Sequence, residues 1–139
     1  MDGKTFYLGH ELNPKEYQEY PLPWDRIFSS AGPLAVEIGF GNGEFLMNWA
    51  RQQPDWNFVG VELSLASMER ILKRIHQSGI RNVKPIHEDA RFAIREFFPD
   101  NSIRHVMMNF PDPWFKERHK HRRLLNESFI RTLAAVLEN

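Results

Sequence analysis

The chain has 139 residues, 18 acidic and 18 basic side chains, and no cysteine. This length suits about one domain, and with 42% hydrophobic residues it can build a core without a disulfide or a metal. The absence of cysteine excludes disulfides, thiolate catalysis and cysteine-ligated zinc. No apolar run approaches the roughly 18–20 residues of a membrane span, and residues 1–10 lack the apolar core of a signal peptide. We therefore expect a cytoplasmic protein without a membrane segment.

Charge is unevenly distributed along the chain. Residues 1–69 contain four Lys or Arg against ten Asp or Glu, whereas residues 70–139 contain fourteen against eight, so the halves carry −6 and +6. Such asymmetry can mark a surface that binds a polyanion. The alternative is that the charges mix in space once the chain folds.

The predicted elements alternate regularly after an irregular start. Residues 1–32 are polar and rich in proline and aromatics, which predicts an N-terminal arm with a helix near 15–20 and a turn near 24–28. Residues 33–139 form the predicted main domain. Its strands are expected at 34–38, 57–62, 83–87 and 103–109, and its helices at 44–53, 64–79, 90–98 and 123–137. Ser64 and Gly79 suit the two ends of the second helix, and Pro85 places its strand at a sheet edge.

This alternation predicts an α/β fold: a Rossmann-like, doubly wound, mostly parallel sheet with helices on both faces. Ligands of such sheets bind at the carboxyl ends of the strands. A doubly wound sheet normally continues with another strand after the helix at 123–137, so we expect the last strands to be missing from this chain.

A glycine-rich loop follows the first predicted strand. Gly39, Gly41 and Gly43 allow a sharp turn and close approach of a ligand to the backbone. The dinucleotide fingerprint requires a small residue where Glu44 stands, so a diphosphate ligand is disfavoured. Glu37 and Glu44 instead suit a cationic ligand such as S-adenosylmethionine, which carries a sulfonium and an amino group. Alone, the loop is weak evidence, because it can also be a simple turn.

Two further acids end the next two predicted strands. Glu62 stands 23 residues after Gly39, close to the spacing at which a carboxylate binds ribose hydroxyls. Asp89, followed by Ala90, can accept a hydrogen bond from an adenine amino group. Each also has a purely structural interpretation, because Glu62 precedes a helix and Asp is a good N-cap. Three acids at successive strand ends behind a glycine loop are more specific than any one of them.

The fourth predicted strand leads into Asn109-Phe-Pro-Asp-Pro-Trp-Phe-Lys116. Two prolines restrict the backbone around Asp112, which is unusual for a plain connection. Asn109 either positions a base or ends the strand, and Trp114 either stacks on guanine or packs on the loop. A basic run follows, which binds phosphates or is a solvated loop; its members are Lys116, Arg118, Lys120, Arg122 and Arg123.

These motifs together resemble the S-adenosylmethionine-dependent tRNA (guanine-N7)-methyltransferases, in order and spacing from about Leu34 to Asn139. The resemblance implies a class I methyltransferase fold, S-adenosylmethionine as cofactor and tRNA as partner. It implies that Asp112 is the catalytic residue and that Lys116 contacts substrate. The cofactor-site residues expected are Glu37, Gly39, Gly41, Gly43, Glu62, Asp89, Ala90 and Asn109. The substrate-site residues expected are Asp112, Trp114, Lys116, Arg118, Lys120, Arg122 and Arg123. Family members continue beyond the end of this chain.

Three other hypotheses compete with this one. The loop at Asn109 only approximates the Asn/Asp-Pro-Pro-aromatic motif of amine methyltransferases, whose substrate is an exocyclic amine or a protein side chain. A shortened chain can also bind tRNA or cofactor without catalysis. A nicotinamide dehydrogenase is disfavoured by Glu44. The histidines show no metal-ligand spacing with nearby acids, so we predict no metal site, and the sequence sets no oligomeric state.

Overall fold

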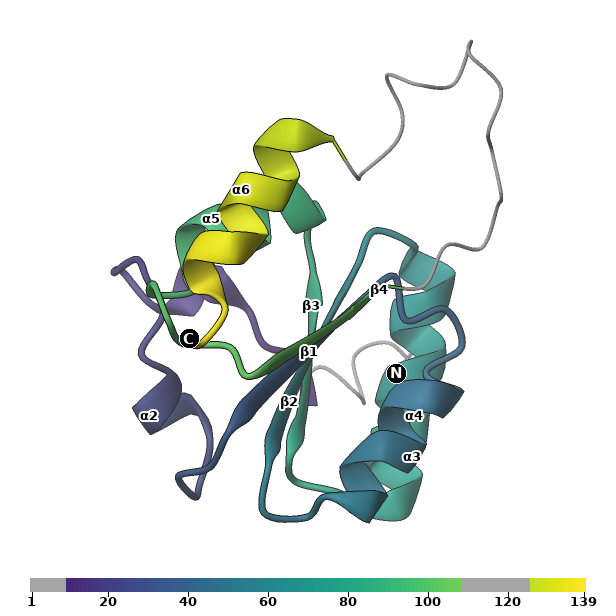
Figure 1. The fold of residues 1–139 in the computed structure, drawn as a ribbon. Coiled ribbons are helices and arrows are strands. Elements are labelled where there is room, and N and C mark those ends of the chain that lie inside the picture. The colour runs from purple at the N-terminus through teal and green to yellow at the C-terminus, as the bar shows by residue number, and fades with distance from the viewer. Residues whose placement is uncertain (1–9, 109–125) are drawn as a thin grey trace, which may run out of the picture.

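Four strands of the computed structural model form one parallel sheet within the described residues, which are 10–108 and 126–139 (Figure 1). The strands are β1 (Leu34–Ile38), β2 (Asn57–Glu62), β3 (Val83–His87) and β4 (His105–Met108). Their order is β3-β2-β1-β4, so the chain reverses direction across the sheet between β1 and β4. The predicted α/β fold with a parallel, doubly wound sheet is confirmed. Ligand sites of such sheets lie where the strand order reverses.

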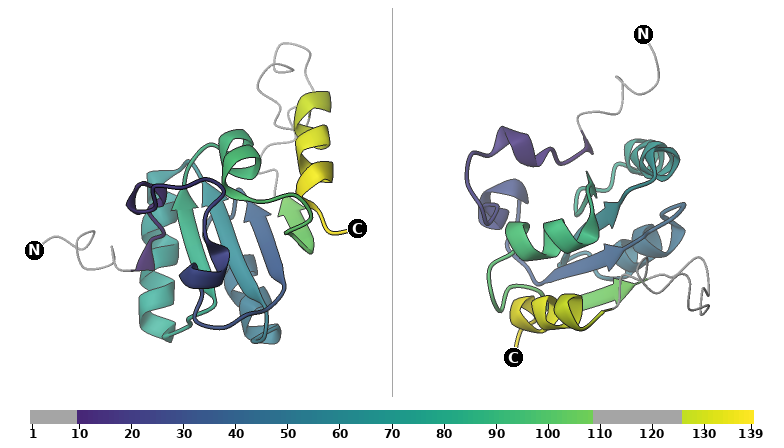
Figure 2. Two further views of the ribbon diagram at one scale, coloured as in Figure 1. Left: turned by 90° about the vertical axis from the view of Figure 1, so that its left-hand side faces the viewer. Right: turned by 90° about the horizontal axis from the view of Figure 1, so that it is seen from above.

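Helices cover both faces of this sheet (Figures 1 and 2). The described helices are η2 (Pro14–Glu16), α2 (Trp24–Ile27), α3 (Glu44–Gln52), α4 (Leu65–Ser78), α5 (Ala90–Phe97) and α6 (Glu127–Val136). None of them has both the length and the apolar character needed to cross a bilayer. On one face, α3 and α4 pack through residues such as Leu46 and Ile71 onto Phe58 of β2. On the other, α5 and α6 enclose a core that includes Phe97 and Phe129.

The segment before β1 packs on the α5 and α6 face. Leu12, Leu22 and Phe28 are buried there. The Leu12 amide donates to the carbonyl of Pro85 at 3.0 Å, and the Leu22 amide donates to that of Phe97 at 3.1 Å. Pro85 thus lies on the edge strand, as predicted, and its carbonyl on the open side is satisfied by the segment before β1.

Three predicted elements differ from the structure. The helix predicted at 123–137 begins at Glu127, because Asn126 is its N-cap and its side chain accepts from the Phe129 amide. In place of a helix at 15–20, only the single turn η2 forms, because Tyr17 is already extended with φ −108° and ψ 120°. The fourth strand begins at His105, because Ile103 pairs with Leu137 in an isolated parallel bridge and the Arg104 amide donates to the Leu34 carbonyl at 2.8 Å.

Gly60 allows α3 and its loop to lie directly against the middle of β2. A Cβ at this position would stand 2.6 Å from Phe40 Cδ2 and 2.7 Å from Leu46 Cδ2, both in buried side chains. Gly60→Ala is therefore expected to lower the free energy of unfolding by about 2 kcal/mol through overpacking. The measurement is the urea unfolding midpoint. Gly79→Ala is the control: its Cβ meets no atom within 4 Å, and only its positive φ of 69° costs about 1 kcal/mol. Equal losses in the two variants would contradict the steric explanation.

Candidate cofactor site at the carboxyl edge of the sheet

The carboxyl ends of β1, β2 and β3 meet at one edge because the strands are parallel and in register. Ile38 pairs with Val61, and Val61 pairs with Ile86. The ladder continues past the strand ends, where the Gly39 amide donates to the Val61 carbonyl at 2.8 Å and the Glu88 amide donates to that of Glu62 at 3.2 Å. The predicted cofactor residues on these three strand ends therefore face a common edge.

The glycine loop has the backbone that its sequence predicts. Gly39, Gly41 and Gly43 have φ values of 72°, 60° and 81°, a region that residues with a Cβ rarely adopt. A Cβ on Gly43 would also lie 2.8 Å from Cγ1 of Ile71, so this glycine lets the start of α3 pack against α4. A Cβ on Gly41 would meet no atom within 4 Å. The backbone at Gly41 is thus open to a ligand.

Glu62 ties the glycine loop to the start of α4. Its Oε1 accepts from the Gly41 amide at 3.1 Å, and its Oε2 accepts from the amides of Leu63 at 2.8 Å and Ser64 at 3.1 Å. A carboxylate has about four acceptor positions, two on each oxygen. Oε2 is therefore fully used, and Oε1 keeps one position for a ligand hydroxyl.

Glu37 is the most unusual side chain of this edge. It is 1% exposed, and its Oε1 is buried without any hydrogen-bond donor among the described residues. Burial, with the nearby charge of Glu62 as a second cause, raises the pKa of Glu37 to about 7. A buried carboxyl without a donor is costly, because its desolvation is not offset. Among the described residues nothing offsets this desolvation, so a cationic or hydrogen-bond-donating ligand would stabilise the ionised carboxyl.

Asp89 is the N-cap of α5. Its Oδ1 accepts from the backbone amides of Arg91 at 2.8 Å and Phe92 at 3.3 Å, and its Oδ2 pairs with the Arg91 guanidinium at 3.3 Å. Burial opposes ionisation, but the hydrogen bonds from Arg91 and Phe92 outweigh it and lower the pKa of Asp89. Ala90 begins the helix and is buried. The capping interpretation of Asp89 is thus observed, and Oδ2 is the oxygen with remaining acceptor capacity.

The structure brings together the predicted residues of the first three strand ends: Glu37, Gly39, Gly41, Gly43, Glu62, Asp89 and Ala90. Others lie outside the described residues: Asn109, Asp112, Trp114, Lys116, Arg118, Lys120, Arg122 and Arg123. Met108, the residue before that segment, pairs with Ile38 at the end of β1. Leu63, which directly follows Glu62 and is 60% exposed, was not among the predicted site residues. The sequence signal for Leu63 is an apolar residue directly after the predicted end of a strand.

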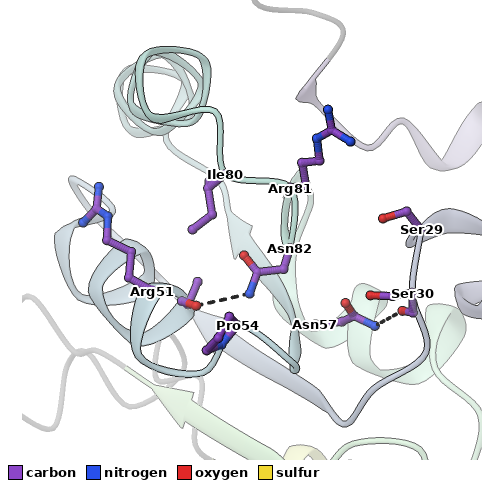
Figure 3. A pocket seen from close by; sticks show the side chains of 9 residues that line it. Ser29, Ser30, Arg51, Pro54, Asn57, Ile80, Arg81 and Asn82 are labelled. Atoms are coloured by element: carbon purple, nitrogen blue, oxygen red, sulfur yellow. Dashed lines mark hydrogen bonds between the residues drawn. The ribbon is translucent and has the colours of Figure 1, made fainter.

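A separate hollow lies at the opposite, amino-terminal edge of the sheet (Figure 3). Its volume is about 340 Å³, and it lies between the end of α3, the turn before β3 and the segment before β1. The lining residues are Ser29, Ser30, Ala50, Arg51, Pro54, Asn57, Ile80, Arg81 and Asn82. No acid lines it, so it is distinct from the cofactor edge.

The sheet order, the glycine loop and the acids at the carboxyl edge define an α/β protein with the class I methyltransferase fold. Residues 31–139 match the methyltransferase family described as "Putative methyltransferase", and the chain belongs to this family. A solved structure with the same fold is an S-adenosylmethionine-dependent methyltransferase from Thiobacillus denitrificans in complex with S-adenosylhomocysteine. It has a TM-score of 0.55 and 26% identity, over 78% of this chain and 39% of that one.

Two curated relatives carry the name tRNA (guanine-N(7)-)-methyltransferase. The one from Thermotoga maritima is 46% identical over 129 residues, which cover 93% of this chain and 41% of that protein. The one from Thermus thermophilus is 41% identical over 126 residues, which cover 91% and 40%. The chain thus spans about two fifths of the length of these relatives.

Proposed function

We propose that the chain is the cofactor-binding part of an S-adenosylmethionine-dependent enzyme that methylates N7 of guanine in tRNA in the cytoplasm. The observation that carries the cofactor assignment is Glu37, a buried carboxyl near Glu62 with one oxygen that has no hydrogen-bond donor in the described part of the chain. The substrate assignment is supported by the names of the two relatives and by the segment from Asn109 to Arg123.

The described residues fit this cofactor. Its cationic end suits the acidic pair of Glu37 and Glu62, because an opposite charge offsets the desolvation of the buried carboxylate. The free position on Glu62 Oε1 suits a ribose hydroxyl. Asp89 Oδ2 suits the adenine amino group, and exposed Leu63 offers an apolar contact for the ring. The open backbone at Gly41 leaves room for close approach.

Methyl transfer to guanine N7 requires correct positioning of the base and stabilisation of the positive charge that develops on it. When bound, the cofactor supplies an electrophilic methyl group on its sulfonium. Guanine N7 has a lone pair and no proton, so the chain needs no general base and gains most from holding the base in line. The methylated ring is cationic, and we assign its stabilisation to the carboxylate of Asp112. We assign contact with tRNA phosphates to the basic run that begins at Lys116.

The decisive experiment is transfer of a labelled methyl group to unmodified tRNA, followed by digestion to nucleosides. The expected product is 7-methylguanosine. Label on an exocyclic amine or on protein would instead support an amine methyltransferase. Binding of S-adenosylhomocysteine without any turnover would support a non-catalytic binding role, and absence of binding would overturn the cofactor assignment.

Asp89 variants separate its capping role from a ligand role. Asp89→Ala is expected to lose about 1 kcal/mol of stability with the cap, whereas Asp89→Ser keeps an N-cap oxygen and most of that stability. Both remove the carboxylate, so both are expected to bind S-adenosylhomocysteine about 3–10-fold more weakly, the value of one hydrogen bond. Calorimetry and thermal unfolding give the two readouts. Unchanged affinity in Asp89→Ser would show that Asp89 acts only as a cap.

A further inference from the structure

The arginines of the described residues divide into two groups by their partners. Five form an ion pair with an acid: Arg26, Arg91, Arg95, Arg104 and Arg131. The other four have no acid within ion-pair distance in the described part of the chain: Arg51, Arg70, Arg74 and Arg81. All four are exposed.

The unpaired group lies in one layer of the molecule. Arg51 is in the last turn of α3, Arg70 and Arg74 are on α4, and Arg81 follows α4 in the turn before β3. These helices cover one face of the sheet, whereas the paired arginines lie on α2, α5 and α6 and before β4 (Figures 1 and 2). Lys73 adds a fifth exposed cation to the layer. We call these five residues the α3/α4 basic surface.

Neighbouring acids do not neutralise this surface. The same layer contains three exposed acids, Glu44, Asp55 and Glu69, so it keeps a net positive charge of two with the five cations. Cations are common near the carboxyl ends of helices, where they offset the helix dipole. That explanation accounts for Arg51, but Arg70 and Arg74 stand before the last turn of α4.

The surface is joined to both edges of the sheet. The Arg74 Nε donates to the carbonyl of Asn42 in the glycine loop at 2.9 Å, which links the surface to the cofactor edge. At the other end, Arg51 and Arg81 flank the hollow that Ser29 and Ser30 also line (Figure 3). The cations therefore follow the layer from the glycine loop to the amino-terminal edge.

We propose that the α3/α4 basic surface binds the phosphate backbone of RNA, in addition to any contact made by the run at 116–123. Arginine suits this role because its planar guanidinium binds phosphate oxygens in pairs. A membrane surface fits less well, because the exposed large apolar residues of the layer, Phe45 and Leu65, stand at the amino ends of α3 and α4. Arg51 and Arg81 stand at the opposite ends of these helices. The identification of the RNA as tRNA rests on the proposed function. The positive charge of this surface is independent of that function.

The test compares two triple variants with the same change in charge. Arg51→Gln/Arg70→Gln/Arg81→Gln removes three unpaired arginines and leaves Arg74 in place because it contacts the glycine loop. The control, Arg26→Gln/Arg104→Gln/Arg131→Gln, removes three exposed arginines from ion pairs. Thermal unfolding verifies both folds. Affinity for an unmodified tRNA transcript is measured over a series of salt concentrations.

The surface variant is expected to bind about 10-fold or more weakly at low salt, and the slope of log K against log salt should become shallower by about 2. The control should bind within about 2-fold of the parent chain. Arg51→Lys/Arg70→Lys/Arg81→Lys keeps the charges, so it should retain the parent slope.

Two results would overturn the proposal: equal affinities of the surface and control variants for tRNA, or charge-dependent binding to phosphatidylcholine–phosphatidylglycerol vesicles with none to tRNA. The parent chain is assayed in parallel for methyl transfer and for S-adenosylhomocysteine binding. A parent chain that neither transfers methyl groups nor binds S-adenosylhomocysteine, combined with tRNA affinity lost only in the surface variant, would overturn the proposed function and support the basic surface. Methyl transfer by the parent chain, combined with equal tRNA affinities of the surface and control variants, would support the proposed function and overturn the role of the basic surface.

Discussion

Alanine in place of Asp112 is expected to lower kcat for methyl transfer to tRNA by about 10²–10³-fold, the usual effect of removing one charge-stabilising group. The physical reason is that methylation makes the purine ring cationic while N7 releases no proton. A nearby carboxylate lowers the energy of that charge as it develops. Met108, the last described residue before the segment that contains Asp112, pairs with Ile38 at the cofactor edge.

The asparagine variant separates two roles of Asp112. Asp112→Asn keeps the shape and one acceptor oxygen but loses the charge. If Asp112 stabilises the cationic ring, Asn is expected to be nearly as inactive as Ala; if it orients the guanine amino edge, Asn should keep much of the activity. Single-turnover rates give the comparison, with S-adenosylhomocysteine affinity and melting temperature as controls. Full activity of the alanine variant would remove Asp112 from the catalytic role.

Local sequence signals predicted the framework that carries the site. The strands Leu34–Ile38, Asn57–Glu62 and Val83–His87 have the predicted bounds, because each is a short apolar run between turn-forming residues. The ends of α4 also match, since the Ser64 hydroxyl accepts from the Ser67 amide and Gly79 is left-handed with φ 69°. These features depend only on residues that are neighbours in the chain, so they can be predicted from the local sequence.

Features that depend on distant contacts were not predictable in the same way. The segment at 15–20 has helix-compatible residues, but the segment before β1 is fixed by the backbone bonds of Leu12 to Pro85 and Leu22 to Phe97. Ile103 continues the apolar pattern of β4, yet it pairs with Leu137, which lies after α6. Periodicity does not reveal such partners.

The charge asymmetry shows the same limit. In the described residues of the basic half, the mixing hypothesis holds for some arginines and not for others, and the polyanion hypothesis stays a prediction. Arginines of α5 and α6 do mix with acids, whereas Arg70, Arg74 and Arg81 have no acidic partner in the described residues. Whether an arginine forms an ion pair depends on the layer of the fold in which its helix packs. The net charge of one half of the chain does not reveal that layer.

Glu37→Gln is expected to have opposite effects on ligand binding and on stability. Above pH 7 the wild-type carboxyl is ionised and can hold the cationic end of S-adenosylmethionine, whereas the amide keeps an acceptor oxygen but lacks the charge. A hydrogen bond to a charged group is worth about 1.5–3 kcal/mol, so affinity at pH 8 should fall by about 10–100-fold. Calorimetric titration with S-adenosylhomocysteine, whose amino group remains cationic, gives the measurement.

Binding to the wild-type chain should also depend on pH near neutrality. Because the pKa of Glu37 is about 7 without ligand, a cation that binds the carboxylate must first displace its proton below that pH. Wild-type affinity is therefore expected to fall by up to about 10-fold per unit as pH decreases below 7. The Gln variant should show no such dependence between pH 6 and about 8, the range over which its amide does not titrate. A flat wild-type profile would show that Glu37 does not contact the cation.

The ligand-free chain should show the reverse effect on stability. The pKa of Glu37 rises from its usual 4.5 to about 7 on folding, so its neutral form stabilises the fold fully below pH 4.5. That contribution is lost as pH rises through 7, at a cost of about 2–4 kcal/mol by pH 8. Glu37→Gln should thus unfold at higher urea than wild type at pH 8 and at similar urea at pH 4. Glu127→Gln, at an exposed position of α6 where Glu127 pairs with Arg131, is the control and should change stability by less than about 1 kcal/mol and leave affinity unchanged. Greater stability with weaker binding in the Glu37 variant alone would show that this carboxylate is kept for its ligand at the expense of the fold.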